Sequence, residues 1–386
     1  SFREVGTTVF RSGFSHNNFA FIFRCGPYVN HQHFEQGAFF LADRGEEFLG
    51  EIGRTDYYAD DWYQNLVIQP GGHNCILVNG NPESQRHGDF LHDVPAWKDH
   101  ASTTDFFTFE DGAFVSGKLD PLYFGALDSL RRSALYLEPR TVILIDEIMG
   151  TPEAHSIELR FHAPFMEDIS ADGGDIRVTR PGGALTIRTF SPASFRSEIL
   201  RRPMTLREIG DKNPQNMKKR GFIQLSISFE NGVRNAVFVN ALSTDREAMS
   251  QFDHRSLAGH AVFSYHGRRY AVNTSNGARY RAGDAITDAL VFAPLKNGFL
   301  ALRTTEAAAP GAPAVRADKS VSLRLETGKR VSLSYAAPED ARLTITVSSK
   351  PEAVIIDGKQ INGWKYNAAE GLSFTLPAGG GRVEIR

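Results

Sequence analysis

The sequence predicts an all-β protein: a large two-sheet antiparallel β-sandwich over residues 1–306, followed by a small C-terminal β-sheet domain over residues 316–386. Three observations predict this class. More than a dozen short segments show the two-residue alternation or the short apolar runs that are typical of strands. Turn residues separate these segments at short spacing, and the 35 Gly and 28 Phe suit tight turns and half-buried strands. Patterns with the period of a helix are scarce.

The strands of the predicted sandwich follow one another from about residue 5. Residues 38–42 form an expected strand, Arg44 and Gly45 a turn, and residues 47–51 a return strand. Residues 141–145 are a continuous apolar run, which predicts a central strand buried on both faces, and the three residues before it predict a hairpin turn. Further strands are expected at residues 106–109, 113–115, 133–137, 157–162, 176–178, 185–189, 222–229, 236–239, 261–265 and 269–273.

Two stretches interrupt the strand pattern. Residues 307–314 are small and include prolines, so we interpret them as a linker or a loose surface connection. Residues 195–220 hold 8 Arg and Lys against 3 Asp and Glu and are broken by Pro203 and Pro214. We interpret them as a long exposed loop, either simply solvated or in contact with an acidic polymer. The small C-terminal domain is expected to have strands at residues 321–325, 331–335, 343–347, 354–356 and 372–376.

Composition excludes several classes of protein. The chain carries 43 Lys and Arg and 45 Asp and Glu, a net charge of −2, and it contains no reading motif, so no nucleic-acid partner is expected. No apolar run reaches the roughly 18–20 residues needed to span a bilayer. Cys25 and Cys75 are the only cysteines, which excludes a disulfide scaffold. Two buried free thiols, one bridge, and a Cys75 thiolate ligand all remain open.

Candidate metal ligands are concentrated in one stretch of the chain. His31 and His33 lie two residues apart, so on a strand both imidazoles share a face. A strand, a hairpin and a third strand that begins at His73 bring His33, Glu51 and His73 together. Two neutral imidazoles and one carboxylate suit zinc, and we predict a zinc site formed by these three residues.

The same stretch resembles a known family. The run NHQHFEQG at residues 30–37, the Glu-Ile-Gly at residues 51–53 and the His-Asn pair at residues 73–74 resemble the heparinase II/III family of polysaccharide lyases. Residues 6–13 resemble the first strand of that family's central β-sandwich, and the resemblance is clear over about residues 5–165. It implies an enzyme that cleaves uronic-acid-containing polysaccharide, with a zinc ion that is chiefly structural.

The resemblance also implies roles for individual residues. His31 matches the family's catalytic histidine, and Asn30 matches a residue next to the substrate carboxylate. The family has a tyrosine near the substrate in the loop between the second and third ligands. We predict Tyr58 as catalytic and Tyr57 and Tyr63 as substrate-binding, although the sequence leaves open which tyrosine corresponds. A lyase needs such groups to neutralise the uronate carboxylate, remove the C5 proton and protonate the leaving oxygen.

Two features depart from the family pattern. Glu35 and Glu51 stand where the family usually has aspartate, and the longer side chain changes the geometry at a metal ion. The family's fold begins with an α/α toroid domain that supplies its main catalytic tyrosine, and nothing of that kind precedes Ser1. The resemblance therefore implies the β-sandwich portion of a lyase, whose toroid lies on the parent chain or on a second chain.

Alternative functions remain open at this point. A non-catalytic carbohydrate-binding or scaffold module of the same fold agrees with the missing toroid and the two glutamates. A glycoside hydrolase needs a pair of carboxylates, and the sequence places none with comparable support. For a lyase we expect an acidic polysaccharide as partner and a bacterial periplasmic or secreted location, with which the lack of a signal peptide agrees. Heparan sulfate, hyaluronan, alginate and ulvan-like polymers are all candidate substrates.

Overall fold

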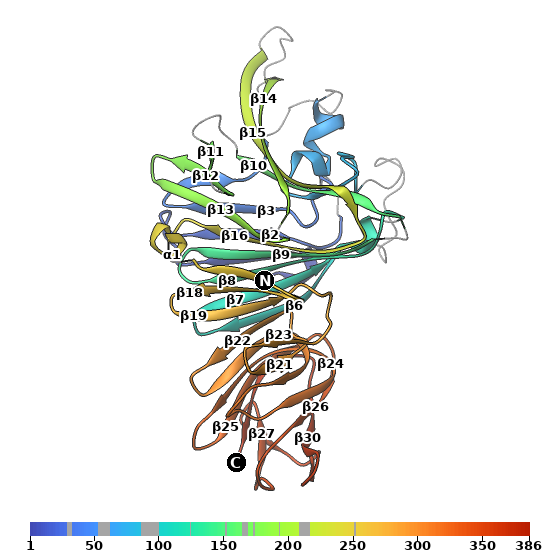
Figure 1. Ribbon diagram of the computed structural model, residues 1–386, viewed down its shortest axis with the longest axis vertical. Coiled ribbons are helices and arrows are strands. Elements are labelled where there is room, and N and C mark those ends of the chain that lie inside the picture. The colour runs from blue at the N-terminus through green and yellow to red at the C-terminus, as the bar shows by residue number, and fades with distance from the viewer. Residues whose placement is uncertain are drawn as a thin grey trace. The chain divides into compact units, whose positions relative to one another are not determined.

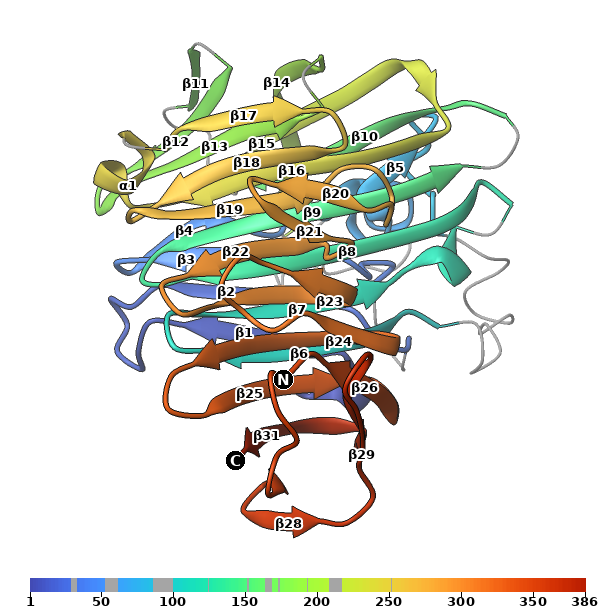
Figure 2. The ribbon, with the colours of Figure 1, turned by 60° about the horizontal axis from the view of Figure 1, so that its bottom comes forward.

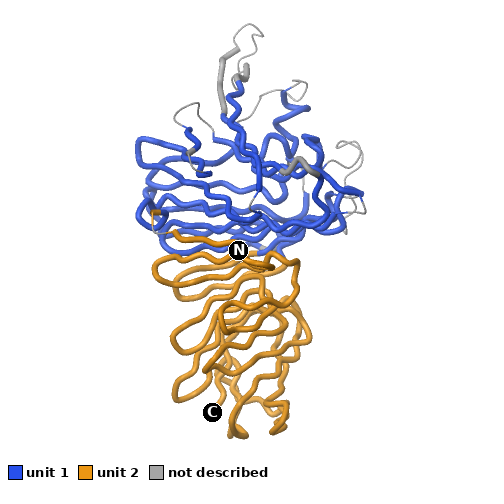
Figure 3. Tube along the Cα trace, viewed as in Figure 1, with its two compact units in different colours: residues 1–103, 116–249 blue, residues 104–115, 250–386 orange. Residues whose placement is uncertain are grey.

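The computed structural model describes residues 1–28, 33–52, 62–85, 100–123, 125–150, 153–163, 169–172, 174–192, 194–207, 217–250 and 252–386. These residues form two compact units, one of residues 1–103 and 116–249 and one of residues 104–115 and 250–386 (Figure 3). Antiparallel strands make up most of both units. The prediction of an all-β sandwich is therefore confirmed.

The first unit contains three sheets, whose strands lie in layers in Figures 1 and 2. One has the order β1 (Thr7–Arg11), β2 (Ala20–Arg24), β3 (Phe39–Asp43), β4 (Glu46–Leu49). Another has the order β14 (Arg196–Arg207), β15 (Met217–Val233), β10 (His155–Ala163), β5 (Ile76–Val78). The third runs β11 (Ile169–Asp172), β12 (Asp175–Arg180), β13 (Gly183–Ser191), β16 (Asn235–Ser243), β9 (Thr141–Gly150), β8 (Leu127–Leu137). Strands β6 (Ser102–Phe109) and β7 (Gly112–Lys118) contain residues of both units.

Aromatic rings in stacked and edge-on contacts pack in the core between the sheets of the first unit. Phe10 on β1 and Phe19 before β2 each lie 5.6 Å, centroid to centroid, from the ring of Tyr136 on β8. Phe39 on β3 lies 5.6 Å from Phe161 on β10. Strand β9 is buried from Thr141 through Asp146 and lies between β16 and β8, as its apolar run predicted. Such rings bury large apolar areas, so this contact stabilises the packing of the sheets.

A buried ion pair connects the central strands to the segments described below as the candidate site. Arg132 on β8 and Asp146 on β9 are both fully buried, and the guanidinium donates to the carboxylate over 2.6 and 3.1 Å. Its remaining nitrogen donates to the carbonyl oxygens of Gly37 and Asn74, each over 2.7 Å. A buried charge needs this full set of partners, so Arg132 fixes the backbone at both carbonyls.

Helical structure is limited to short turns in the described residues, and no helix there is long and apolar enough to cross a membrane. The short elements are η1 (Arg3–Val5), η2 (Tyr63–Val67), η3 (Pro70–Gly72), η4 (Asp120–Leu122) and α1 (Arg246–Ser250).

The second unit is built around one large antiparallel sheet, coloured gold-yellow to red in Figure 2. Its strands share one apolar core that includes Phe292, Phe299 and Phe374. The main order is β17 (His254–Leu257), β18 (His260–Tyr265), β19 (Arg268–Asn273), β22 (Val291–Leu295), β23 (Gly298–Ala308), β24 (Val315–Thr327), β25 (Val331–Ala337), β31 (Gly379–Ile385), β27 (Val354–Ile356), β28 (Lys359–Ile361). Off this path lie β20 (Tyr280–Ala282), β21 (Ala285–Thr287), β26 (Ala341–Ile345), β29 (Lys365–Asn367) and β30 (Gly371–Leu376).

The interpretation of residues 307–314 as a linker is wrong. Ala307 is fully buried and pairs with Val315, so these residues form the end and the turn of the β23–β24 hairpin. Small residues there pack into the core rather than loosening the chain. The compact units divide near residue 250, whereas the predicted division is into residues 1–306 and 316–386. Compact units and sequence domains are defined differently, so the division at 306–316 stays a prediction.

The interpretation of residues 195–220 as an exposed loop is also wrong for its described part. Strand β14 pairs with β15 from Arg196 opposite Ser228 to Arg207 opposite Met217. Pro203 sits within β14, which is the edge strand of its sheet. An edge strand tolerates proline because one side of its backbone needs no partner.

Candidate metal centre

Glu51 is positioned by a hairpin and by strand β10. Strands β3 and β4 are joined through Arg44 and Gly45, whose φ angles of 52° and 79° form the predicted tight turn. The chain leaves β4 at Leu49, and the N–H of Gly50 donates to the carbonyl oxygen of His162 on β10 over 3.0 Å. This bond sets the backbone one residue before Glu51.

His73 follows two tight helical turns. Its N–H donates to the carbonyl oxygen of Pro70 over 3.1 Å, which ends η3. Glycine is required just before it, because a Cβ on Gly72 would lie 2.3 Å from the carbonyl oxygen of Leu66 in η2. His73 is 1% exposed, so its ring is fixed in a buried position. The third strand that was expected to begin at His73 begins later, as β5.

His33 lies in an irregular segment that precedes β3. The prediction that it projects from a strand is therefore wrong. The N–H of Phe34 donates to the carbonyl oxygen of Ile68 over 2.8 Å, which ties this segment to the turn that carries His73. His33 reaches the site through this long-range backbone contact rather than through strand alternation.

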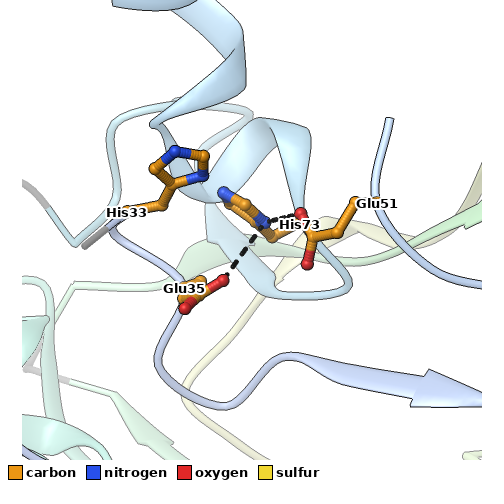
Figure 4. Close-up of side chains that lie close together, drawn as sticks. All are labelled: His33, Glu35, Glu51 and His73. Atoms are coloured by element: carbon orange, nitrogen blue, oxygen red, sulfur yellow. Dashed lines mark ion pairs between the residues drawn. The ribbon is translucent and has the colours of Figure 1, made fainter. Parts of the chain in front are cut away.

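Four side chains converge around His73 (Figure 4). His33, Glu35, Glu51 and His73 each offer one ligand atom, and these four atoms lie within 4.8 Å of one another. Nδ1 of His73 forms an ion pair with Oε2 of Glu51 and lies 3.8 Å from Oε2 of Glu35. The rings of His33 and His73 have centroids 5.2 Å apart. The structure thus places the three predicted ligands together and adds Glu35.

Burial and neighbouring charge set the protonation states of this group. Burial, helped by the charge of His73, lowers the pKa of His33 to about 4, so its imidazole is neutral at pH 7. Desolvation opposes charge on the buried His73 and also on Glu51, whose side chain is 46% exposed, but the attraction between the two groups outweighs it. The pKa of His73 is raised and that of Glu51 is lowered. Burial raises the pKa of Glu35. A cation at this position would therefore replace the proton shared by His73 and Glu51.

This donor set fits a zinc ion. Two imidazole nitrogens and two carboxylate oxygens are ligands that zinc accepts, and four such ligands match its tetrahedral preference. Ideal bonds would place neighbouring ligand atoms about 3.3 Å apart. The four ligand atoms lie within 4.8 Å of one another, so small side-chain movements would bring them to this spacing. The group could therefore hold a metal ion, and the identity of that ion as zinc stays a prediction.

Glu35 was missed as a ligand because the prediction assigned a single carboxylate, that of Glu51, to the ion. The signal was nonetheless present, since Glu35 lies two residues after His33. The structure also brings two carboxylates together, Glu35 and Glu51. Both are directed at the same imidazole of His73 rather than at an open space between them. This arrangement favours a shared cation over the pair that a glycoside hydrolase needs.

The other predicted site residues divide into two groups. Tyr63, in η2, is described: its ring stands edge-on to that of His33, with the centroids 6.1 Å apart and an interplanar angle of 83°. The remaining four lie outside the described residues, so their predicted roles stay predictions. They are Asn30, His31, Tyr57 and Tyr58.

Neither cysteine belongs to this group. Cys25 and Cys75 are buried free thiols, which agrees with one of the alternatives left open above. Burial raises the pKa of both, so a thiolate is disfavoured. Cys75 instead lies within 3.7 Å of the carbonyl oxygen of Gln36 and of the side-chain nitrogen of Gln85.

Asn74 braces the segments that carry the candidate metal ligands. Its side-chain nitrogen donates to the carbonyl oxygen of Phe39 on β3 over 2.6 Å. Its side-chain oxygen accepts the N–H of His162 on β10 over 2.7 Å. The carbonyl of that same His162 accepts the N–H of Gly50. The buried side-chain amide of Asn74, next to His73, therefore holds this segment against β3 and β10, and β10 in turn holds the backbone just before Glu51.

We expect Asn74→Ala to lower the free energy of unfolding by about 1–3 kcal/mol, because each buried group left without a partner carries that cost. Thermal or denaturant unfolding of the purified chain measures the change. Asn362→Ala is the matched control: Asn362 is exposed and makes no described side-chain contact, so its change should stay within about 0.5 kcal/mol. Equal stability of the two variants would show that Asn74 does not brace the site.

Solved structures share this fold. Heparinase III, the BT4657 gene product, is 14% identical, with a TM-score of 0.55 over 70% of this chain and 41% of that one. The heparan sulfate lyase HepC of Pedobacter heparinus is 15% identical, with a TM-score of 0.53 over 72% and 42%. The chondroitin AC lyase of Streptomyces coelicolor A3, in complex with chondroitin sulphate, is 13% identical, with a TM-score of 0.54 over 98% and 48%.

These identities establish the fold alone, and the chain spans less than half the length of each of these three enzymes. No curated protein matches the sequence. Residues 1–249 match the family described as Heparinase II/III-like, C-terminal. That match covers more than half of the chain and includes every residue of the candidate metal centre. The chain belongs to the heparinase II/III-like family, of which it contains the C-terminal region.

Proposed function

We propose that this chain is the β-sandwich portion of a polysaccharide lyase that cleaves uronic-acid-containing polysaccharide by β-elimination and carries a structural zinc. The observation that carries the proposal is the convergence of His33, Glu35, Glu51 and His73 within the region that matches the family. Structural zinc sites are closed by four protein ligands, and zinc accepts His nitrogens and carboxylate oxygens as well as Cys sulfurs. Here such an ion would join the β3–β4 hairpin, the η2–η3 turns and the segment at His33.

In the proposed reaction a base removes the proton on C5 of the uronate. The electron pair of that C–H bond forms a double bond between C4 and C5, the bond from C4 to the glycosidic oxygen breaks, and an acid protonates the leaving oxygen. Asn30 donates to the substrate carboxylate and stabilises the enolate-like charge that develops there. His31 and Tyr58 carry out these two proton transfers, at C5 and at the leaving oxygen. When bound, the zinc supplies rigidity to the floor of the site.

Tyr63 is the proposed contact with the sugar ring. Its ring is half-buried and packs edge-on against His33, which fixes its direction. An aromatic body with a polar tip suits a sugar, because the ring covers C–H groups while the hydroxyl reaches an oxygen. Tyr57 is proposed as a second contact in the same loop. The metal ligands thus also position the aromatic surface that holds the substrate.

The partner needed to complete this site is an α/α toroid domain, on the parent chain or on a second chain. This proposal agrees with the share of each lyase structure that the chain spans, which is less than half. We also propose a bacterial periplasmic or secreted location, because a polymeric acidic polysaccharide is met outside the cytoplasm.

We expect the zinc-loaded 386-residue chain alone to turn over uronate polymers very slowly or not at all. A missing acid or base group typically lowers a rate by about 10²–10⁴-fold, and the toroid supplies one such group by resemblance. Absorbance of the unsaturated product measures the rate, with the toroid-containing parent enzyme as the control.

Full activity of the isolated chain would contradict the need for a toroid and would assign the base to Tyr57, Tyr58 or Tyr63. A parent enzyme that binds uronate polymer without ever forming unsaturated product would contradict the lyase proposal itself. It would favour the alternative of a non-catalytic carbohydrate-binding module.

A further inference from the structure

The second unit contains a pocket of about 440 Å³ that the proposed lyase reaction does not use. It opens over strands β18, β19 and β22 and is walled by the β20–β21 hairpin and the start of the β23–β24 turn. All of its lining residues lie between residues 257 and 310, within the second unit. Its volume is in the range of pockets that hold small-molecule ligands.

The sheet of the unit lies beneath this pocket. Val262 on β18 pairs with Ala271 on β19, and Ala271 pairs with Phe292 on β22. Directly paired residues share a face, so these three side chains form one surface, and all three are buried members of the unit's core. These three side chains are only 0–7% exposed, so the apolar surface open to a ligand comes instead from Leu257, which is 46% exposed, and from exposed Pro310.

Two arginines border the pocket without an anionic partner. Arg269 lies two residues before Ala271 on β19 and therefore projects from the same face, and Arg281 lies on β20. Both are exposed, and neither forms a hydrogen bond or ion pair with any residue that the structure describes. Neighbouring arginines outside the pocket are paired, Arg268 with Asp111 and Arg279 with Glu306. Arg269 and Arg281 are thus available to an anionic ligand.

A carboxylate and an imidazole border the same pocket. Asp284 is exposed in the turn between β20 and β21 and has no ion pair within the described ranges. His260 is 7% exposed; its ring packs 4.9 Å from that of Tyr280, and its Nδ1 lies 3.3 Å from the carbonyl oxygen of Ala258. Burial lowers the pKa of His260, and the charge of Arg269 acts in the same direction.

We propose that this pocket binds the acidic end of a saccharide, with Arg269 and Arg281 on its carboxylate or sulfate group. A sugar of this kind has the three features that the pocket matches. Its anionic group takes charge-assisted hydrogen bonds from guanidinium groups, its hydroxyls donate to Asp284, and its C–H face covers the exposed apolar surface of Leu257 and Pro310. A bare inorganic anion would use the arginines only.

The class of sugar assigned to this pocket rests on the proposed lyase function. Because the site is separate from the metal centre in sequence and in unit, it would retain the chain on its polymer or hold a released product. It would not take part in the elimination step.

Titration of the zinc-loaded chain with D-glucuronate, followed by ligand-observed NMR, tests the inference. Single Arg269→Gln and Arg281→Gln variants should each weaken binding by about tenfold or more, because a charge-assisted hydrogen bond contributes about that factor. Arg342→Gln is the matched control, an exposed arginine on β26 outside the pocket. It should bind as the parent does, and all three variants should keep the parent's melting temperature.

Two further ligands sharpen the result. D-Glucose should bind much more weakly than D-glucuronate, and inorganic sulfate should not reach the affinity of glucuronate. Sulfate binding as tight as glucuronate would reduce the pocket to a general anion site and overturn the saccharide assignment. Glucuronate binding that is absent, or unchanged in the Arg269→Gln/Arg281→Gln double variant, would overturn the inference altogether.

The elimination assay separates this inference from the proposed function. In the toroid-containing parent, the double variant should leave turnover of a short uronate substrate unchanged. If the unmodified enzyme turns over substrate normally but shows no binding at the pocket, the pocket inference alone is refuted. Normal pocket binding in a parent enzyme that forms no unsaturated product would refute the lyase proposal alone.

Discussion

The His73→Ala variant is expected to purify without zinc and to unfold at a markedly lower temperature than the parent chain. His73 is the centre of the group: it is 1% exposed, forms an ion pair with Glu51 and lies 3.8 Å from Glu35. Losing a residue that only supports a ligand typically costs about 10–100-fold in metal affinity, so losing a ligand should cost more than about 100-fold. The variant also leaves two carboxylates facing each other without a counter-charge, which destabilises the metal-free fold as well.

Zinc per chain by elemental analysis, and melting with and without chelator, measure this result. The parent is expected to hold one zinc per chain and to lose thermal stability in chelator, because metal binding to a folded site is folding free energy. Glu51→Ala should follow the same direction and should cost more stability than activity. His16→Ala is the control, an exposed histidine in the β1–β2 loop. A metal-free parent whose melting temperature is indifferent to chelator would remove zinc from the proposal.

Much of the fold could be predicted from the sequence because burial follows strand alternation. The run at residues 141–145 became a strand buried on both faces, and the expected strands after residue 320 correspond to β24, β25, β26, β27 and β30. The errors arose where composition was taken to decide local structure. Proline in β14 is tolerated on an edge strand, and the alanines near residue 307 pack into a core.

The candidate site could be predicted only in part. His33, Glu51 and His73 stand out because few residue types bind zinc and because they resemble a known pattern. Their actual arrangement depends on contacts with no local signature. The bond from Phe34 to Ile68 and the two bonds of the His162 backbone join segments that are distant in sequence. Glu35 entered the group through that irregular path, which strand alternation does not describe. The pocket bordered by Arg269 and Arg281 has no sequence motif at all.

His31→Ala is expected to lower the turnover of the toroid-containing enzyme by about 10²-fold or more, a normal loss for an acid–base group. Zinc content and melting temperature should stay nearly unchanged. The reason is a division of labour between two histidines that are two residues apart. His33 faces His73 within the metal-ligand group, with their ring centroids 5.2 Å apart. His31 matches the catalytic histidine by resemblance, and a neutral imidazole near pH 7 can take or give a proton.

His33→Ala should show the reverse pattern, with metal and thermal stability lost first and activity lost as a consequence. Added zinc should then restore part of the activity of His33→Ala and none of the activity of His31→Ala, because only the first variant is limited by metal occupancy. Zinc content, melting temperature and product absorbance on the same preparations separate the two patterns. If both variants lose zinc and stability together, His31 is a ligand, and the proton transfer assigned to it must belong to a tyrosine of the loop or to the toroid.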